Sequence, residues 1–489
     1  MNAANNYYPK KSFTLCIMLF TFFLMISGCV TTQNSSTATD APAQDEVFQI
    51  NEKTVKGMIN RAEPLIEEAT EMRFKNKMKC EVVKRDVIRD ELTQDLIPQL
   101  KKLLNTANDD MVTRQAEMSA QLASLSILGK YSLSRKTFYI VPDNVNTVVK
   151  ALDIKDDQIK DFVFLLVTHE MVHALDDQYF DLKEKIKGRK NIESASAFNS
   201  LMEGHAVYVT NTVADKLKLS DTAKQLSVKS AAGLSGEVNR MQQQAYHSVY
   251  EKGAEFVEAI VNKKGPAIIA AAFNNPPAST AQIMNPDQYL NPAAVASLDC
   301  TAIIKKVAKQ LPVKGMGVQS LDIGGMVLRT MLISKGIPES EAAPIADNCN
   351  GGGVLIAAKQ AMQTSKGISI FIVNFNNGET VSKFDDISQK IEKSAIAQVN
   401  ARLNASYRTI KEEDLDLEGF NVARSKQIET RIDDKVTKKL ESSAIIDNMY
   451  IEVGFENMDD LTQKDLVDIL KQIYTEQSEM KKEADTASL

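Results

Sequence analysis

Helical periodicity dominates the first third of the chain. From about 47 to 105, apolar residues recur at spacings of three and four between charged ones, which predicts amphipathic helix. A second helix is expected from about 109 to 128, because Gly129 interrupts the pattern. Residues 136–141 then predict a short strand, which Pro142 closes.

A more apolar helix is expected from about 156 to 175. Its middle, Phe162 to Val167, is apolar on every face, so this helix must be buried. Gly351-Gly352-Gly353 indicates either a tight turn or a close approach of two backbones. Further segments with helical spacing are 193–217, 222–262, 265–273, 296–310 and 317–335, and strand-like segments are 368–375 and 449–455. The pattern predicts an α+β fold that is predominantly helical.

Changes in composition divide the chain into five parts. Residues 1–28 form an apolar leader, and 29–46 are rich in Ser, Thr, Ala and Gln and read as a flexible tether. A domain that contains the buried helix is expected over 47–295, followed by a helical extension at 296–378. The last part, 379–489, is predicted to be a charged helical region that ends in a helix from about 460.

The leader resembles a bacterial lipoprotein signal. The apolar run from Phe13 to Ile26 is too short to span a bilayer comfortably and is typical of a signal peptide. Ile26-Ser-Gly-Cys29 resembles the lipobox, which implies cleavage before Cys29 and a lipid anchor on that residue. Val30, in place of Asp, favours the outer membrane, facing the periplasm or the exterior. The alternative is an ordinary secretory signal in which the Cys is incidental.

Charge and cysteine content restrict the class of protein. Lys and Arg number 58 against 64 Asp and Glu, a net charge of −6 that argues against nucleic acid as a partner. After cleavage, three cysteines remain besides Cys29, so an exported chain would keep at least one unpaired. Cys300 and Cys349 flank one compact segment and are the expected pair, with Cys80 left over.

His169-Glu170-Met171-Val172-His173 is an H-E-x-x-H motif inside the expected buried helix. Residues four apart on a helix project from the same face, so the two imidazoles can bind one Zn²⁺ ion. Glu170 is placed to act on a zinc-bound water rather than on the metal. The alternative is two core histidines beside an acid, but burying that acid without a partner would cost several kcal/mol.

A catalytic zinc site needs a third protein ligand, and Glu203 in Leu201-Met-Glu-Gly-His-Ala206 is the candidate. This arrangement resembles the gluzincin branch of zinc peptidases, whose third ligand is a Glu on a following helix. His205 is the rival ligand. Asp176 and Asp177 could each accept a hydrogen bond from a ligand imidazole, or they are only the polar end of the helix.

The segment Tyr250-Glu-Lys-Gly-Ala254 is similar to one in the zinc aminopeptidase and leukotriene-hydrolase family. The resemblance implies that Tyr250 stabilises the oxyanion, and Tyr246 and His247 are the alternative donors. The other interpretation is that Tyr250 only packs at the start of a helix. The family's Gly-x-Met-Glu-Asn motif is absent, so aminopeptidase activity is not implied. From about 137 to 289 the chain also resembles bacterial "peptidase MA-like" proteins, with Asn285-Pro286 where these often have His-Pro.

These resemblances imply a zincin-like catalytic core with a short edge strand and a buried active-site helix. The leading hypothesis is a membrane-anchored zinc metallopeptidase that hydrolyses a protein or peptide substrate. One rival is a binding or assembly lipoprotein with a structural or residual zinc site, and another is a zinc hydrolase that does not cleave peptides. An intact Glu170 favours an enzyme, because a structural site needs no general base.

Overall fold

The computed structural model describes residues 48–104, 109–189, 191–229, 247–291, 299–360, 365–401 and 404–487. The chain forms two compact units that divide between Ala278 and Ser279, with Asn191–Glu193 grouped with the second unit. Within the described ranges, no helix combines the length and apolar character needed to cross a membrane. The predicted signal peptide, tether and Cys29 lie outside the described residues.

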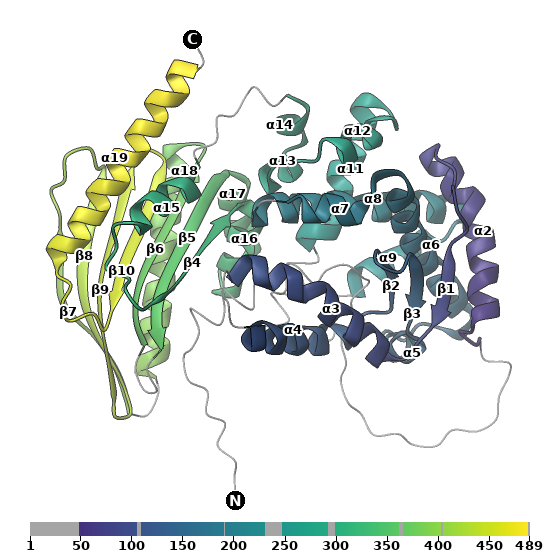
Figure 1. Ribbon diagram of the computed structural model, residues 1–489, viewed down its shortest axis with the longest axis horizontal. Helices are drawn as coiled ribbons and strands as arrows, with labels where there is room; N and C mark the ends of the chain where they lie inside the picture. Colours follow the sequence, from purple (N-terminus) through teal and green to yellow (C-terminus); the bar gives the residue numbers. More distant parts are fainter. Residues whose placement is uncertain are drawn as a thin grey trace, which may run out of the picture. The chain divides into compact units, whose positions relative to one another are not determined.

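The first unit is mostly helical and carries one small sheet (Figure 1). The sheet has the order β1-β3-β2, with β1 parallel and β2 antiparallel to β3. Its strands are β1 (Lys79–Val82), β2 (Gly129–Ser132) and β3 (Thr137–Ile140). Its helices are α2 (Glu52–Thr70), α3 (Arg85–Leu104), α4 (Asp109–Ser124), α5 (Pro142–Ala151), α6 (Asp156–Phe180), α7 (Leu182–Lys187), α8 (Ile192–Leu217), α9 (Ser220–Lys229), η1 (His247–Glu251), α11 (Lys252–Lys264) and α12 (Ile268–Asn274).

Helix α6 is the centre of this unit. Every residue from Phe162 to Asp177 is buried, so the expectation from its all-round apolar middle is confirmed. One core lies between α6, α2, α5 and the sheet, where Phe138 and Ile140 of β3 point. Tyr139 of the same strand points to a second core with α3 and α4. The predicted strand at 136–141 is therefore covered on both faces.

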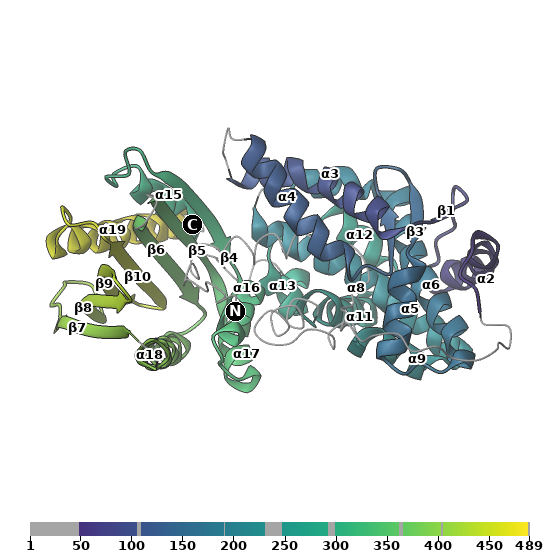
Figure 2. The same ribbon diagram turned by 90° about the horizontal axis from the view of Figure 1, so that it is seen from below.

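The second unit is built on a seven-stranded antiparallel sheet of order β4-β5-β6-β10-β9-β8-β7. Apolar residues of α15 and α19 pack on one face of the sheet, and those of α16, α17 and α18 pack on the other (Figure 2). The strands are β4 (Gly317–Ile323), β5 (Cys349–Gln360), β6 (Ser365–Phe375), β7 (Ala405–Asp414), β8 (Val422–Ile432), β9 (Lys435–Ile446) and β10 (Met449–Glu456). The helices are α13 (Thr280–Met284), α14 (Pro286–Leu290), α15 (Cys300–Ala308), α16 (Gly325–Ser334), α17 (Glu339–Asp347), α18 (Gly378–Asn400) and α19 (Gln463–Ala487).

The prediction that 296–378 and 379–489 are helical regions is only partly right, because α15 to α19 are present, the last helix near its expected start, but both parts also supply strands to one sheet. The strands expected at 368–375 and 449–455 are present, but they belong to a sheet of seven, and 317–323 is a strand rather than the start of a helix. The many charges in β7, β8 and β9 suggested solvated helices. In β8, Ala423 and Ser425 are buried while Arg424 and Lys426 face the other side, which is the period of a strand.

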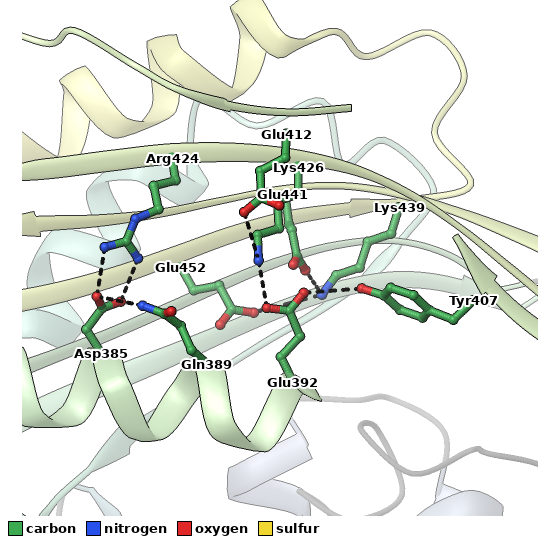
Figure 3. A network of polar contacts seen from close by, with 10 residues as sticks. All are labelled: Asp385, Gln389, Glu392, Tyr407, Glu412, Arg424, Lys426, Lys439, Glu441 and Glu452. Carbon is green, nitrogen blue, oxygen red and sulfur yellow. Dashed lines mark hydrogen bonds and ion pairs between the residues drawn. The ribbon is translucent and has the colours of Figure 1, made fainter. Parts of the chain in front are cut away.

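Two charged side chains of β8 bind α18 (Figure 3). Arg424 of β8 forms two hydrogen bonds to Asp385 of α18, at 3.2 and 3.0 Å. Lys426 lies 2.8 Å from Glu392 of α18 and 3.3 Å from Glu412 of β7. Because each charge has an opposite partner, a polar sheet face can hold a helix that buries little apolar area in its second half.

Buried carboxylates organise the start of α8. Asp322 at the end of β4 accepts hydrogen bonds from the backbone N–H groups of Ile192 and Glu193. The Glu193 carboxylate in turn accepts bonds from the backbone and the hydroxyl of Thr280. Burial, with Asp322 nearby, raises the pKa of Glu193 to about 7. The Glu193 carboxyl also fills the space that a Cβ on Gly324 would need.

Two further expectations concern cysteines and glycines. The expected Cys300–Cys349 disulfide is not formed, since Cys80, Cys300 and Cys349 are all free and buried. Gly351-Gly352-Gly353 lies within β5 rather than in a turn. A Cβ on Gly352 would sit 2.6 Å from the Ile372 carbonyl oxygen, so the close-approach interpretation is the right one.

Candidate metal centre

Helices α6 and α8 bring two imidazoles and one carboxylate to a single point. The Nε2 atoms of His169 and His173 lie 3.2 Å apart, and each is 3.2 Å from Oε2 of Glu203. The histidines share one face of α6 because they are four residues apart, and Glu203 faces them from the middle of α8. All three side chains are buried, and together they can hold a metal ion.

The donor set fits a small cation. Two imidazole nitrogens that meet at 3.2 Å repel each other as acceptors unless a proton or a cation lies between them. Around an ion with bonds of roughly 2.0–2.1 Å, two tetrahedral ligands lie roughly 3.3 Å apart, which agrees with the three distances found here. Nδ1 of His173 and Oε1 of Glu203 have no hydrogen-bond partner among the described residues. Three closely spaced donors leave one tetrahedral position for water or substrate.

The three candidate ligands shift one another's pKa values. Burial lowers the pKa of His173, but the adjacent Glu203 carboxylate outweighs it and raises the pKa to about 9. Burial raises the pKa of Glu203, but the two histidines outweigh it and lower the pKa to about 2. The Glu203 carboxylate is therefore ionised at neutral pH, whereas a metal ion that binds His173 would first have to displace the proton from its imidazole.

Glu170 lies beside the ligands but does not join them. Its Oε2 accepts a 2.7 Å hydrogen bond from the backbone N–H of Tyr131 in the edge strand β2. Its Oε1 is buried and has no partner among the described residues. One oxygen is thus fixed in place, and the other is available to accept a proton.

Tyr250 lies next to one of the candidate metal ligands, His169. It is buried on η1, a single π-helical turn, and its ring is 6.1 Å from the His169 ring at an angle of 27°. π-helical turns occur often at functional sites. Tyr246 lies outside the described residues, and so does the side chain of His247.

A contact between two glycines fixes the Tyr250 segment against α8. A Cβ on Gly204 would lie 2.1 Å from the carbonyl carbon of Gly253, and a Cβ on Gly253 would lie 2.2 Å from the Ser200 carbonyl oxygen. Only glycine at both positions lets α8 and α11 approach this closely. Gly204 follows Glu203 directly and Gly253 follows Tyr250 by three residues, so the contact sets the separation of these two side chains.

His205, the rival ligand, is bonded elsewhere. Its Nδ1 lies 2.9 Å from Oδ2 of Asp176, and its ring packs against Phe273. Asp177 accepts hydrogen bonds from the Tyr131 hydroxyl, the Lys136 ammonium and the Leu182 backbone. The hydrogen bonds of Asp176 and Asp177 therefore go to groups other than the imidazoles of His169 and His173. The expectation that either aspartate would accept a hydrogen bond from a ligand imidazole is not met.

Tyr131 is the residue near the site that the sequence did not reveal. It holds Glu170 through a backbone N–H, which every residue except proline carries, so the residue type gives no hint. Strand β2 has only four residues, all buried, and therefore lacks the alternation that marks a strand. The nearest clue was the strand at 136–141, since a hairpin partner preceding it was a reasonable expectation.

Comparison with known proteins does not identify a function for the chain. No protein-family model and no curated protein matches the chain. Among solved structures, a protein from Chloroflexus aurantiacus, described as a candidate hydrolase with a novel fold, is similar at 19% identity with a TM-score of 0.39. The match covers 58% of this chain and 97% of that one. A likeness this remote establishes neither fold nor activity, so the gluzincin and zincin resemblances stay predictions.

Proposed function

We propose that the chain is a zinc-dependent hydrolase that cleaves peptide bonds, with His169, His173 and Glu203 as the metal ligands. The main evidence is the buried triangle of two imidazoles and one carboxylate, whose three facing nitrogen and oxygen atoms lie 3.2 Å from one another. Neutral imidazole and carboxylate donors are a combination that zinc binds in catalytic sites. A zinc ion held there would act as a Lewis acid and make water nucleophilic near neutral pH.

The other residues would supply the proton transfer and the oxyanion contact. Glu170 is the general base, because its Oε1 is unpartnered among the described residues while the Tyr131 N–H holds Oε2. Tyr250, stacked near His169, is the donor toward the carbonyl oxygen on which negative charge develops. A non-catalytic zinc site would leave the position of Glu170 without a purpose.

The experiment combines metal analysis with digestion of a broad peptide library. Wild type should contain one zinc per chain and cleave peptides. Glu203→Ala should lose zinc, whereas Glu170→Gln should keep zinc and lose activity, because Glu170 acts on water and not on the ion. Glu193→Gln, a buried glutamate on the same helix as Glu203 but away from the site, is the matched control and should keep both. A zinc-loaded wild type that is inert across the library would favour the binding or assembly alternative.

We also propose that the protein is anchored to the outer membrane through a lipid on Cys29. The support is the lipobox-like Ile26-Ser-Gly-Cys29 after the apolar run, together with the tether-like composition of 30–46. Cys29→Ser should abolish processing or release the protein from membranes. Normal processing and unchanged fractionation of that variant would contradict the anchor without affecting the zinc assignment.

A further inference from the structure

Tyr131 contacts the active-site helix at two points. Its backbone N–H donates to Oε2 of Glu170 at 2.7 Å, and its hydroxyl donates to Oδ2 of Asp177 at 3.0 Å. Glu170 and Asp177 are seven residues apart, which is close to two turns of α6, so both lie on the same side of the helix. One residue of the edge strand β2 therefore spans two turns of the helix that carries the H-E-x-x-H motif.

Asp177 is built to hold that hydroxyl. Its side chain is 1% exposed, and besides Tyr131 it accepts a 2.6 Å bond from the Lys136 ammonium and one from the Leu182 backbone. A buried carboxylate with three donors is fixed in one orientation. Two partners of Asp177 thus come from the β2–β3 hairpin and the third from the residue that begins α7.

The conformation of Lys136 supports a dedicated role for this contact. Its φ is 53°, in the left-handed region that favours glycine, and it closes the hairpin through its backbone N–H to the Ser132 carbonyl. The ion pair with Asp177 explains why a lysine, rather than a glycine, occupies this left-handed position. The turn therefore directs the ammonium group toward the helix that the hairpin must contact.

We propose that Tyr131 is a positioning residue for Glu170. The pair of Asp177 and Lys136 holds the Tyr131 side chain, the side chain holds strand β2 against α6, and the strand presents the N–H that fixes Oε2 of Glu170. The unpartnered Oε1 then has one orientation. The catalytic consequence rests on the proposed function, whereas the contact itself does not.

Hydrogen–deuterium exchange at the Tyr131 amide tests the contact without any substrate, using the full chain in detergent with residue-level fragmentation. Wild type should protect this amide, and Glu170→Ala should speed its exchange by about fivefold to tenfold, the equivalent of one lost hydrogen bond. Tyr131→Phe keeps the ring and removes only the hydroxyl, and it should speed the exchange by a similar factor. Tyr139→Phe, the same change on the opposite face of the same sheet, should leave it unchanged.

Lys136→Met is a second variant in case Tyr131→Phe folds poorly, because the Lys136 side chain is 52% exposed. It should speed exchange at residue 131 in the same direction by a smaller factor. All of these variants should retain wild-type zinc content, since none changes a proposed ligand. Unchanged protection of the amide in Glu170→Ala, or in both Tyr131→Phe and Lys136→Met, would overturn the proposal.

Turnover then tests the catalytic consequence. With an active wild type, Tyr131→Phe should lower kcat by about tenfold and change KM by less than about twofold, because the position of the base matters chiefly in the transition state. Wild-type kcat in that variant, despite faster exchange, would overturn the positioning role. A wild type without hydrolase activity would refute the proposed function, and the exchange data would still decide whether Tyr131 holds Glu170.

Discussion

Replacing Gly204 by alanine tests the link between backbone packing and the metal centre. A Cβ at this position would lie 2.1 Å from the carbonyl carbon and 2.3 Å from the carbonyl oxygen of Gly253. Ordinary van der Waals contact begins at 3.4 Å, so α8 and α11 would have to separate by 3.4 − 2.1 = 1.3 Å. No flexible side chain can move aside to relieve the clash, because the new Cβ is fixed to its own backbone and meets backbone atoms of Gly253.

The expected magnitude follows from that displacement. Overpacking of a close-packed core costs about 1–3 kcal/mol, and a clash between two backbones belongs at or above the upper end of that range. We therefore expect Gly204→Ala to lower the free energy of unfolding by about 3 kcal/mol or more. Since Glu203 is the adjacent residue and sites tolerate shifts of only about 0.5 Å, zinc affinity should fall at least about tenfold.

Urea denaturation and a competitive zinc titration measure the two effects. Gly57→Ala is the matched control, since Gly57 is exposed inside α2 and its Cβ would meet nothing within 4 Å. That change should stabilise the protein by about 0.5–1 kcal/mol, because alanine favours helix over glycine. Wild-type stability in Gly204→Ala, or the same sign of effect in both variants, would refute the packing argument.

Three further variants or measurements address the second unit. Glu193 binds a proton more tightly in the folded state, with a pKa of about 7 against an ordinary 4.5, so folding stability should fall by up to about 3 kcal/mol as pH rises from 4.5 to 7. Glu193→Gln should remove this part of the pH dependence. If urea denaturation gave the wild type and the variant the same change of unfolding free energy with pH over that range, the prediction would be contradicted. Arg424→Met should cost about 2 kcal/mol in the same assay, because it leaves the nearly buried Asp385 without its cation, and no loss would count against the ion-pair account. Burial raises the pKa of Cys349 to about 12, so it should resist a thiol reagent at pH 8 and titrate as a free thiol only after unfolding without reductant. Rapid reaction of the native thiol would count against this burial.

Part of the candidate site could be predicted because it is local. His169 and His173 share a face of α6 by helix geometry alone, and the apolar flanks already required that helix to be buried. Glu203 was a weaker prediction, since nothing in the spacing shows which residue of a later helix turns toward the histidines. The structure brings it to 3.2 Å from both and directs His205 to Asp176 instead.

The strands of the second unit show why the rest could not be predicted. A strand forms its hydrogen bonds with partners that are distant in sequence, so the charges of a segment such as Val422–Ile432 suggest a solvated helix. In the structure, Asp385 and Glu392 of α18 pair with charges of this strand.

The sequence by itself determined the elements whose partners lie one or two turns away: the buried helix, its two imidazoles and the acid between them. Tertiary structure alone decided the position of Glu203 beside the two imidazoles, the glycine contact between α8 and α11, and the hydrogen bond from Tyr131 to Glu170. These contacts join residues 34, 49 and 39 positions apart. The physical reason is that such contacts depend on where whole helices and strands pack, and a backbone N–H or a missing Cβ leaves little trace in residue type.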